Sequence, residues 1–333
     1  MAEKDLVSLL SSLLTDPAEE VQIAACEALC NVILEFSPMK DEVINNGGVT
    51  SLIGLTFHKN VALRLNATWA VKNLLYLSST QMHEAVMDAL TWKQLLNLLK
   101  DQDPKVQEQA LKLLRNLSSG DKEEGEKNIN RLLNNFGEEL KEILPSVFMG
   151  ANATLIIDGL YTCSNIASGN EEHKNYILSN NALLNAVRDN LLHENPEARI
   201  AATWCVLNLT WREPGRSSPA ENKYIEALSA LEIHKRLEIL ISDSHKDVAE
   251  RAKAALQQKP CKFRAERSKQ RGILTCYQSS LVGLPSSLSV LFSAELFSAS
   301  NKPLSSLSVK KTAEIKDKYS LYLLLRNEKF YSS

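Results

Sequence analysis

Asparagine recurs along this chain at a nearly constant interval, and at three of these sites an aromatic residue lies four positions earlier. The three aromatic–asparagine pairs are Trp69/Asn73, Tyr161/Asn165 and Trp204/Asn208. An amide side chain both donates and accepts hydrogen bonds, so it matches the N–H and C=O groups of an extended peptide. An aromatic ring beside the amide can pack on the stem of a peptide side chain. This combination favours recognition of a peptide.

The asparagines belong to five similar segments. They are Asn31, Asn73, Asn116, Asn165 and Asn208, with spacings of 42, 43, 49 and 43 residues. Two of the segments are nearly identical: ATWAVKNL at 67–74 returns as ATWCVLNL at 202–209. Glu27 and Lys112 take the aromatic position in two other segments, and a sixth segment at 247–258 keeps the apolar pattern without the asparagine. The chain is therefore a repeat array.

Helices must hold these residues in place. Gly (12) and Pro (10) are sparse, which favours helix nearly throughout. Each segment has the apolar spacing of a long helix, preceded by a second apolar helix and usually by a shorter one. Periods near 40–47 residues are typical of HEAT and armadillo solenoids, and the short third helix favours armadillo. The sequence predicts an all-α fold, a right-handed superhelical armadillo solenoid of about six repeats over residues 1–258.

Local signals mark where the helices begin and end. Asp or Asn before Pro is expected to cap the long helix that follows, with Pro in its first turn. These signals are TDP at 15–17, QDP at 102–104 and ENP at 194–196. The glycine pair at 47–48 predicts a hinge between two helices, and the charged stretches GDKEEGEK (120–127) and NEEH (170–173) are expected to be solvated connectors.

Residues four apart share one face of a helix, so stacked repeats place the five amides in a row. One interpretation is structural: the rings pack between repeats and the amides bond to neighbouring backbone. The other is a peptide-binding groove, and five asparagines in register favour it. The predicted groove residues are Asn31, Trp69, Asn73, Asn116, Tyr161, Asn165, Trp204 and Asn208.

Several function classes are disfavoured. Residues 1–258 carry a net charge of −10, with 25 basic and 35 acidic residues, so nucleic acid is an unfavourable partner for them. The apolar stretch 281–300 includes a proline, a glutamate and several serines, which argues against a membrane span. The six histidines have no metal-ligand spacing and are expected mostly in loops or on polar faces, and no phosphate loop or nucleophile motif occurs. We expect no enzyme activity, no cofactor and no small-molecule substrate.

The six cysteines also lack metal spacing and are expected to be buried, reduced thiols. Residues 1–20 have no basic start followed by an apolar stretch and a cleavage site, so no signal peptide is predicted. Together these features predict a cytoplasmic and nuclear protein.

Some stretches resemble a particular armadillo family: ALRLNATWAVKNLLYLSSTQ, LLNLLKDQDPKVQEQALKLLRNL, WCVLNLTW and RAKAALQQ. They are similar to the C-terminal half of the armadillo repeat-containing protein eight family, the armadillo subunits of CTLH/GID E3 ubiquitin ligases. The resemblance covers residues 1–258 and includes the position of Trp211. It implies a scaffold without ligase chemistry, whose repeats dock an interchangeable substrate receptor. The alternative is an importin-alpha-like receptor for basic nuclear-localisation peptides, because those proteins also use tryptophan–asparagine ladders.

The two ends depart from that family. The array opens in a second-type helix without a preceding cap, which predicts the later part of a longer protein or a truncated isoform. Residues 259–333 hold 13 basic and 5 acidic residues and 15 serines, with no periodic apolar stripe. This composition predicts a poorly ordered, splice-derived tail. Its basic segment KFRAERSKQR is the part that could bind an acidic surface, or serve as a nuclear-localisation signal.

Overall fold

The computed structural model describes residues 2–33, 39–120, 122–211 and 221–257. These residues form sixteen helices and no strand. The first half contains α1 (Ala2–Leu13), α2 (Glu19–Val32), α3 (Lys40–Asn45), α4 (Gly48–Leu55), α5 (Val61–Leu75), α6 (Thr80–Ala89), α7 (Trp92–Leu99) and α8 (Pro104–Leu117). The second half contains α9 (Lys122–Met149), α10 (Ala153–Ala167), α11 (Glu171–Leu178), α12 (Asn181–Asn190), α13 (Pro196–Thr210), α14 (Glu221–Ala230), α15 (Ile233–Leu240) and α16 (Lys246–Gln257).

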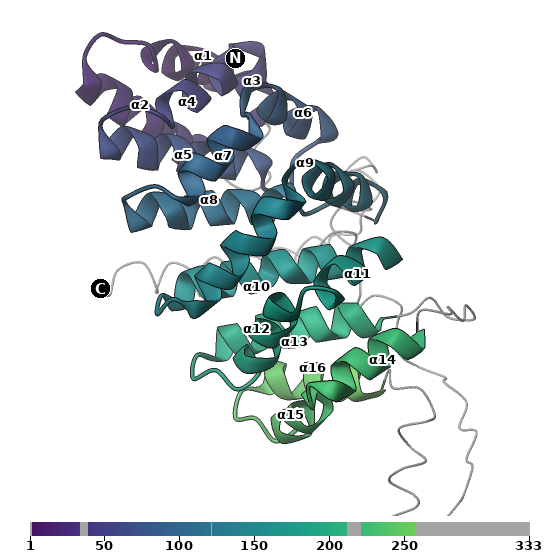
Figure 1. Cartoon of the computed structure of the whole chain (residues 1–333). Helices are drawn as coiled ribbons and strands as arrows, with labels where there is room; N and C mark the ends of the chain where they lie inside the picture. Colours follow the sequence, from purple (N-terminus) through teal and green to yellow (C-terminus); the bar gives the residue numbers. More distant parts are fainter. Residues whose placement is uncertain (1, 34–38, 121, 212–220, 258–333) are drawn as a thin grey trace, which may run out of the picture. The chain divides into compact units, whose positions relative to one another are not determined.

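One long helix ends each repeat, and these helices stack in chain order (Figure 1). The series is α2, α5, α8, α10, α13 and α16, and each member packs against the next. The other helices of a repeat contact its long helix, as α4 contacts α5 and α7 contacts α8. The predicted all-α armadillo solenoid of about six repeats is confirmed, with two helices in the first repeat and three in most others.

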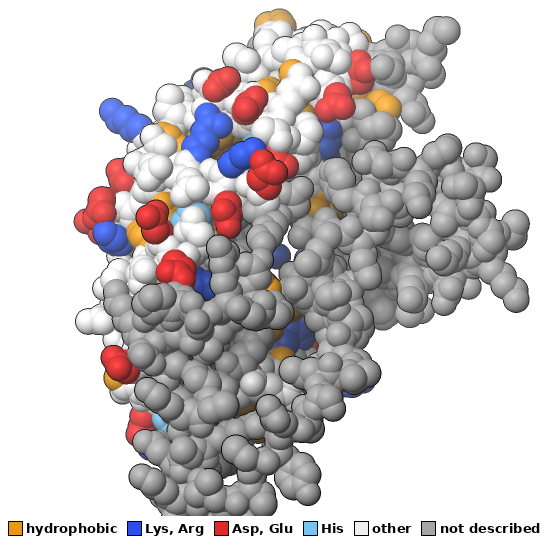
Figure 2. Space-filling view, turned by 90° about the vertical axis from the view of Figure 1, so that its right-hand side faces the viewer, with side chains coloured by type: hydrophobic (Ala, Val, Ile, Leu, Met, Phe, Trp, Pro, Cys, Tyr) orange, Lys and Arg blue, Asp and Glu red, His pale blue; other side chains and the backbone are white. Residues whose placement is uncertain are grey.

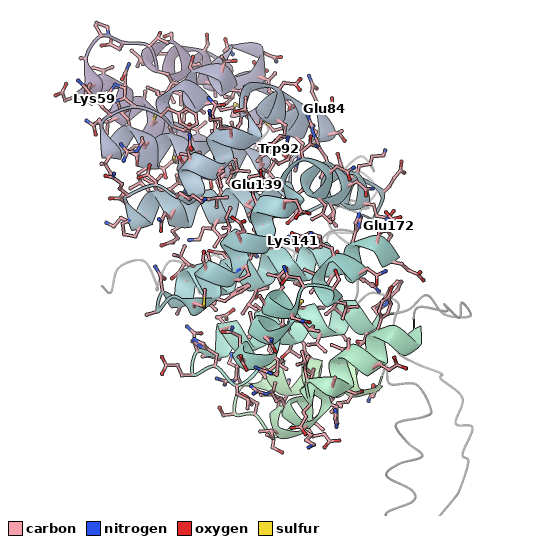
Figure 3. All side chains as sticks on the ribbon, viewed as in Figure 1. Lys59, Glu84, Trp92, Glu139, Lys141 and Glu172 are labelled. Atoms are coloured by element: carbon pink, nitrogen blue, oxygen red, sulfur yellow. The ribbon has the colours of Figure 1, made fainter. Side chains whose placement is uncertain are left out.

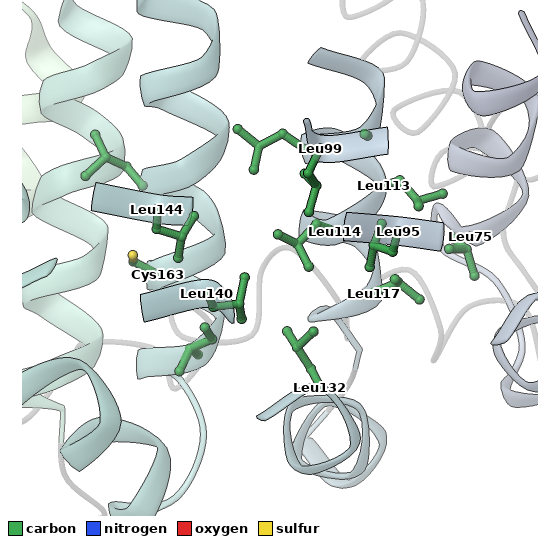
Figure 4. Packing of buried hydrophobic residues seen from close by; sticks show 14 of the residues in the cluster. Leu75, Leu95, Leu99, Leu113, Leu114, Leu117, Leu132, Leu140, Leu144 and Cys163 are labelled. Carbon is green, nitrogen blue, oxygen red and sulfur yellow. The ribbon is translucent and has the colours of Figure 1, made fainter. Parts of the chain in front are cut away.

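A continuous apolar core joins the repeats (Figure 4). Leu113 and Leu114 of α8 are fully buried, as are Leu75 of the preceding long helix and Leu140 of α9. Each fully buried leucine stabilises the fold by about 1.5–3 kcal/mol relative to an exposed one. The stack of long helices is therefore held together mainly by apolar packing.

The fourth repeat differs from the predicted short–medium–long order. Its first two helices are merged into the single 28-residue helix α9, which contains Pro145. Phe136 of α9 is buried and stacks on Trp92, which is labelled in Figure 3, with ring centroids 5.8 Å apart and an angle of 23° between the planes. The long α9 explains why the asparagine spacing rises to 49 residues at this repeat.

Both predicted connectors are wrong. Most of 120–127 lies in α9, and 170–173 is the N-cap and first turn of α11. Lys and Glu have high helix propensity, so a charged stretch without a breaker continues a helix as readily as it forms a loop. Asn170 caps α11, because its side chain accepts hydrogen bonds from the backbone N–H groups of Glu172 and His173.

The predicted caps are confirmed in two of three places. Asp103 caps α8 and Asn195 caps α13, each directly before a proline in the first turn. At 15–17 the prediction is wrong, because α2 begins two residues after Pro17 and its N-cap, Ala18, has no side-chain acceptor. The predicted glycine hinge is confirmed: Gly47 has φ +70° between α3 and α4, a conformation that favours glycine.

Two histidines contradict the expectation of polar or loop positions. His83 of α6 and His173 of α11 are both buried, and burial lowers the pKa of each. His173 Nε2 lies 2.8 Å from Asn130 Oδ1. Both rings are therefore part of the core of the repeats.

No helix among the residues described has the length and apolar character needed to cross a membrane. The predicted tail, 259–333, lies outside the described residues, and the boundary at 258/259 stays a prediction.

A candidate peptide-binding face

The predicted groove residues all lie on successive long helices. We call this surface of α2, α5, α8, α10 and α13 the ladder face. Its residues are Asn31, Trp69, Asn73, Asn116, Tyr161, Asn165, Trp204 and Asn208. Trp69 is 37% exposed, Tyr161 and Trp204 are half-buried, and Asn31 is exposed. Asn73 and Asn116 are buried, whereas Asn165 and Asn208 are half-buried.

Four of the five amides bond to the preceding long helix. Their side-chain nitrogens donate to backbone carbonyls at 3.0 Å: Asn73 to Cys30, Asn116 to Lys72, Asn165 to Arg115 and Asn208 to Ser164. Asn165 and Asn208 also donate to the hydroxyls of Ser118 and Ser164. Asn31 donates instead to the carbonyl of Glu27 in its own helix, at 3.2 Å.

These bonds give the ladder amides a structural role between repeats. They occupy donors of each amide, while within the described residues no hydrogen bond reaches the Oδ1 atoms of Asn73, Asn116, Asn165 and Asn208. A carbonyl oxygen can accept two hydrogen bonds. The row thus holds its amides in a fixed orientation with acceptors still available to a peptide.

A cation lies beside each aromatic ring of the ladder face. Lys72 Nζ is 5.5 Å from the centroid of Trp69, and Arg115 Cζ is 4.2 Å from that of Tyr161. Trp204 has the Arg251 Cζ atom of α16 at 4.8 Å from its centroid. Distances below about 6 Å are typical of cation–π contacts. These cations were not among the predicted groove residues, although Lys72 and Arg115 each directly precede a ladder asparagine.

Polar links also connect the ladder helices. Asn66 of α5 donates to the carboxylate of Glu27 on α2 at 3.1 Å. Asp158 of α10 pairs with Arg115 of α8 at 3.2 Å. Asp158 is only 3% exposed, and its Oδ2 atom has no hydrogen-bond partner among the residues that the structure describes. Burial raises the pKa of Asp158 despite the attraction of Arg115 and Lys112.

The repeated octapeptide corresponds to a repeated bonding pattern. Arg64 of α5 donates two hydrogen bonds to Asp101, at 2.8 and 3.0 Å, and also bonds to the carbonyls of residues 58 and 59. Arg199 of α13 does the same with Asp243, at 2.8 and 2.9 Å, and with the carbonyls of residues 193 and 194. Six of the eight letters recur, and in each copy an arginine three residues before the octapeptide ties its repeat to the next.

Catalytic or metal chemistry has little support in the described part of the chain. No group of three or more His, Cys, Asp or Glu side chains there could hold a metal ion. Four cysteines are buried and unpaired, as predicted, while Cys261 and Cys276 lie outside the described residues. Burial raises the pKa of Cys26, Cys30 and Cys163 to about 12, so these thiols are protonated near neutral pH.

Two open depressions lie away from the ladder residues. The larger, about 530 Å³, is lined by Arg188 of α12, by Leu192 just after that helix, and by residues of α14 and α15 such as Ile239. The other is lined by residues of α4, α6 and α7. Figure 2 shows one side of the molecule, on which acidic and basic side chains are mixed and apolar ones form small separate spots.

The chain is similar to one family of known armadillo proteins. The family described as the VID28/GID5 C-terminal domain matches residues 55–154. Armadillo repeat-containing protein 8 of Danio rerio is 31% identical over 250 residues, which cover 75% of this chain and 36% of that protein. GID complex subunit 5 of Schizosaccharomyces pombe is 25% identical, with 77% of this chain and 38% of that protein covered. The resemblance to this family is confirmed, and the chain spans about a third of the length of these relatives.

Two further similarities bear on the fold and on the alternative function. Importin subunit alpha-1b of Oryza sativa is 28% identical over 62% of this chain and 36% of its own length. A designed armadillo repeat protein in complex with the peptide (KR)4 superposes with a TM-score of 0.65 at 21% identity, covering 76% of this chain and 98% of the designed one. The likeness to the designed protein establishes the armadillo fold of this chain.

Proposed function

From the confirmed resemblance to armadillo repeat-containing protein 8 and GID complex subunit 5, we propose that this chain is a non-catalytic scaffold subunit of a GID-type E3 ubiquitin ligase. In this role it docks a substrate receptor through the ladder face and acts in ubiquitin-dependent protein degradation. Its partners are proteins: the receptor and other ligase subunits, in the cytoplasm and nucleus. No cofactor is required for such a role.

The observation that carries the docking role is the preorganised row of amides and rings. Inter-repeat hydrogen bonds of 3.0 Å fix the amides of α5, α8, α10 and α13 before any partner binds. Preorganisation reduces the entropy lost on binding. Trp69 adds an exposed aromatic surface, and aromatic residues are enriched among the residues that dominate binding energy at interfaces.

The importin-like alternative is supported by the distant similarity of this chain to importin alpha subunits. It is disfavoured by the cations that lie beside the rings of the ladder face. A receptor for Lys- and Arg-rich peptides needs open aromatic faces and acidic neighbours. Here Lys72, Arg115 and Arg251 already lie against the three rings. Lys112 replaces a fourth ring. We therefore favour receptor docking.

A pair of matched tryptophans gives the test. Trp69 on the ladder face and Trp211 at the C-cap of α13 are both 37% exposed, and each has a lysine Nζ within 6 Å of its ring centroid. The full chain, tagged and expressed in cells, is purified as parent, Trp69→Ala and Trp211→Ala, and bound proteins are identified by mass spectrometry. We expect the parent and Trp211→Ala to recover a substrate receptor of the ligase, and Trp69→Ala to recover at least fivefold less.

Equal recovery by Trp69→Ala and the parent would show that the receptor binds elsewhere. Recovery of importin beta and basic cargo in place of ligase subunits would support the alternative function. Circular dichroism of each purified variant checks that the helices are retained.

A further inference from the structure

Among the described residues, the stack of repeats begins with α1 and α2 (Figure 1). From α5 to α13, each ladder asparagine donates to the carbonyl of the residue directly before the preceding ladder asparagine. Asn73 donates in this way to Cys30, and Asn208 to Ser164. Asn31 differs, because it is exposed and donates to a carbonyl of its own helix. Asn31 therefore lies on the side of α2 that corresponds to the contact with a preceding repeat.

Two alanines of α2 lie on the same side. Ala24 precedes the ladder asparagine of α2 by seven residues, the position that Asn66 takes on α5 and Asp158 on α10. Asn66 and Asp158 are buried, and each bonds to a side chain of the preceding long helix. Ala24 is exposed instead. Ala28 is half-buried, whereas Ala70 at its position on α5 is fully buried.

α1 extends this open side with two leucines. Leu9 is 57% exposed and lies ten residues before the first residue of α2. Gln94 and Arg236 take the same position before α8 and α16, and both contact the preceding repeat. Gln94 lines the depression beside α4, and Arg236 donates to the carbonyl of Arg188 at 3.0 Å. Leu6, one helical turn before Leu9, is 43% exposed.

We call this surface the leading edge. Its residues are Leu6, Leu9, Ala24, Ala28 and Asn31. None of them is charged, and exposed apolar side chains that gather in one patch mark an interaction site. The exposed Glu20 of α2 lies at the rim, because its position stays exposed at Lys105 of α8 and Glu197 of α13, where a preceding repeat is present.

The last described long helix ends the stack with a charge. Lys253 of α16 is exposed and lies seven residues after the first residue of its helix. In the other long helices this position is buried: Cys26, Thr68, Leu111, Leu160 and Thr203. A polar outer face at the end of a solenoid keeps it soluble. Head-to-tail stacking of two copies would bury Lys253 against the apolar leading edge, which is unfavourable for an unpaired charge.

We propose that two copies of this chain form a dimer through their leading edges. A second leading edge is apolar and brings no charge into the contact, and a two-fold axis pairs the same patch on both copies. Leu6 and Leu9 of each copy are then covered by apolar side chains of the other, and Ala24 and Ala28 let the two α2 helices approach closely. Such a contact is closed, so that assembly stops at two copies. The dimer presents two ladder faces.

Sedimentation velocity of the full chain tests the dimer, at concentrations of about 2 and 100 µM. At the higher concentration we expect twice the chain mass of 37.1 kDa and no larger species. Leu9→Glu and Ala24→Arg each place a charge in the contact, one from each helix, and are expected to weaken dimerisation at least tenfold. Ile239→Glu is the matched control, since Ile239 on α15 is 60% exposed, and it is expected to leave the dissociation constant within twofold.

The remaining outcomes overturn the proposal. A monomer at the higher concentration shows that the leading edge does not pair. Dimers that persist in both Leu9→Glu and Ala24→Arg show that the copies associate through another surface or through residues 258–333. A mass that rises beyond two copies indicates open head-to-tail stacking in place of a two-fold contact. Circular dichroism checks that each variant keeps its helices, which we expect because Leu9 and Ala24 are exposed in the single chain.

Discussion

At the scale of single residues, the arginine that precedes each repeated tryptophan by five positions ties two repeats together. The side chains of Arg199 and Asp243 are only 14% and 9% exposed. Hydrogen bonds from Arg199 and from the backbone N–H of His245 lower the pKa of Asp243, although burial alone would raise it. Both charges of this pair are largely removed from water. If one partner is lost, the other remains as a buried charge without an ion pair, which destabilises the fold.

We expect Arg199→Ala to lower the free energy of unfolding by about 3 kcal/mol, because Asp243 stays buried without its partner and two loop carbonyls lose a donor. Urea denaturation followed by circular dichroism measures the change. Arg188→Ala is the control, since Arg188 pairs with the exposed Asp189 and such a pair contributes less than about 1 kcal/mol. Similar losses in both variants would contradict the role assigned to Arg199.

Asp158 and Asp101 are predicted to give opposite pH dependence. Burial raises the pKa of Asp158, so the folded state holds its proton more tightly and stability falls as pH rises above about 3.9 through the folded pKa. The pKa of Asp101 is lowered because hydrogen bonds from Arg64 and from the N–H of Asp103 outweigh its burial. Its contribution is therefore present above about 3.9 and is lost as pH falls through the folded pKa.

We accordingly expect Asp158→Asn to be more stable than the parent at pH 7, with a difference that shrinks toward pH 4.5. Asp101→Asn, by contrast, is expected to be less stable at pH 7, with a deficit that diminishes only at still lower pH. Urea denaturation over this pH range measures both. A less stable Asp158→Asn at pH 7 would show that the ion pair with Arg115 outweighs the burial of the charge.

At the scale of elements, the N-caps of two helices predict one substitution that lowers the stability of the fold and one that raises it by a similar amount. Asp103 caps α8 by accepting from the N–H groups of Lys105 and Val106, whereas Ala18 begins α2 with suitable extended dihedrals and no acceptor. We expect Asp103→Ala to cost about 1 kcal/mol and Ala18→Ser to gain about 0.5–1 kcal/mol. Thermal unfolding measures both changes, and a destabilised Ala18→Ser would mean that the half-buried site has no room for the hydroxyl.

The elements also show what the sequence could predict. Apolar spacing and the asparagine period located the long helices, because both are local properties of one helix face. The bonds from Asn73 to Cys30 and from Asn208 to Ser164 join residues more than 40 positions apart, so no local pattern predicts them. The length of α9 was missed for a different reason: residues 120–127 are charged, and because Lys and Glu also have high helix propensity, their charge does not distinguish a connector from the start of a helix.

The ladder itself was only partly readable from the sequence. The register of Asn116 and Asn165 on one face follows from helix geometry, and the structure agrees with it. Which atoms of each amide form hydrogen bonds depends on the distance between its long helix and the preceding one. Lys72 contacts the ring of Trp69 within α5, whereas Arg115 of α8 contacts the ring of Tyr161 in the next repeat, which no local pattern predicts.

At the scale of the whole array, stability is carried by contacts between neighbours in the stack. Long helices contact the next one along the chain, so a solenoid behaves approximately as a one-dimensional series of coupled units. A defect in the middle of such a series weakens the coupling on both sides. A defect at its end frays a single unit.

We therefore expect two leucine-to-alanine substitutions in the core to destabilise different numbers of helices, although their local costs are similar. Leu114 of α8 is fully buried in the middle of the series, and Leu237 of α15 is 3% exposed in the last described repeat. Each change to Ala is expected to cost about 3 kcal/mol locally. Hydrogen exchange followed by mass spectrometry should show faster exchange in α5, α8 and α10 for Leu114→Ala, and only in α14, α15 and α16 for Leu237→Ala. Uniformly faster exchange in every helix for either variant would instead indicate one all-or-none unit, and the docking face would then lose its order as a whole rather than repeat by repeat.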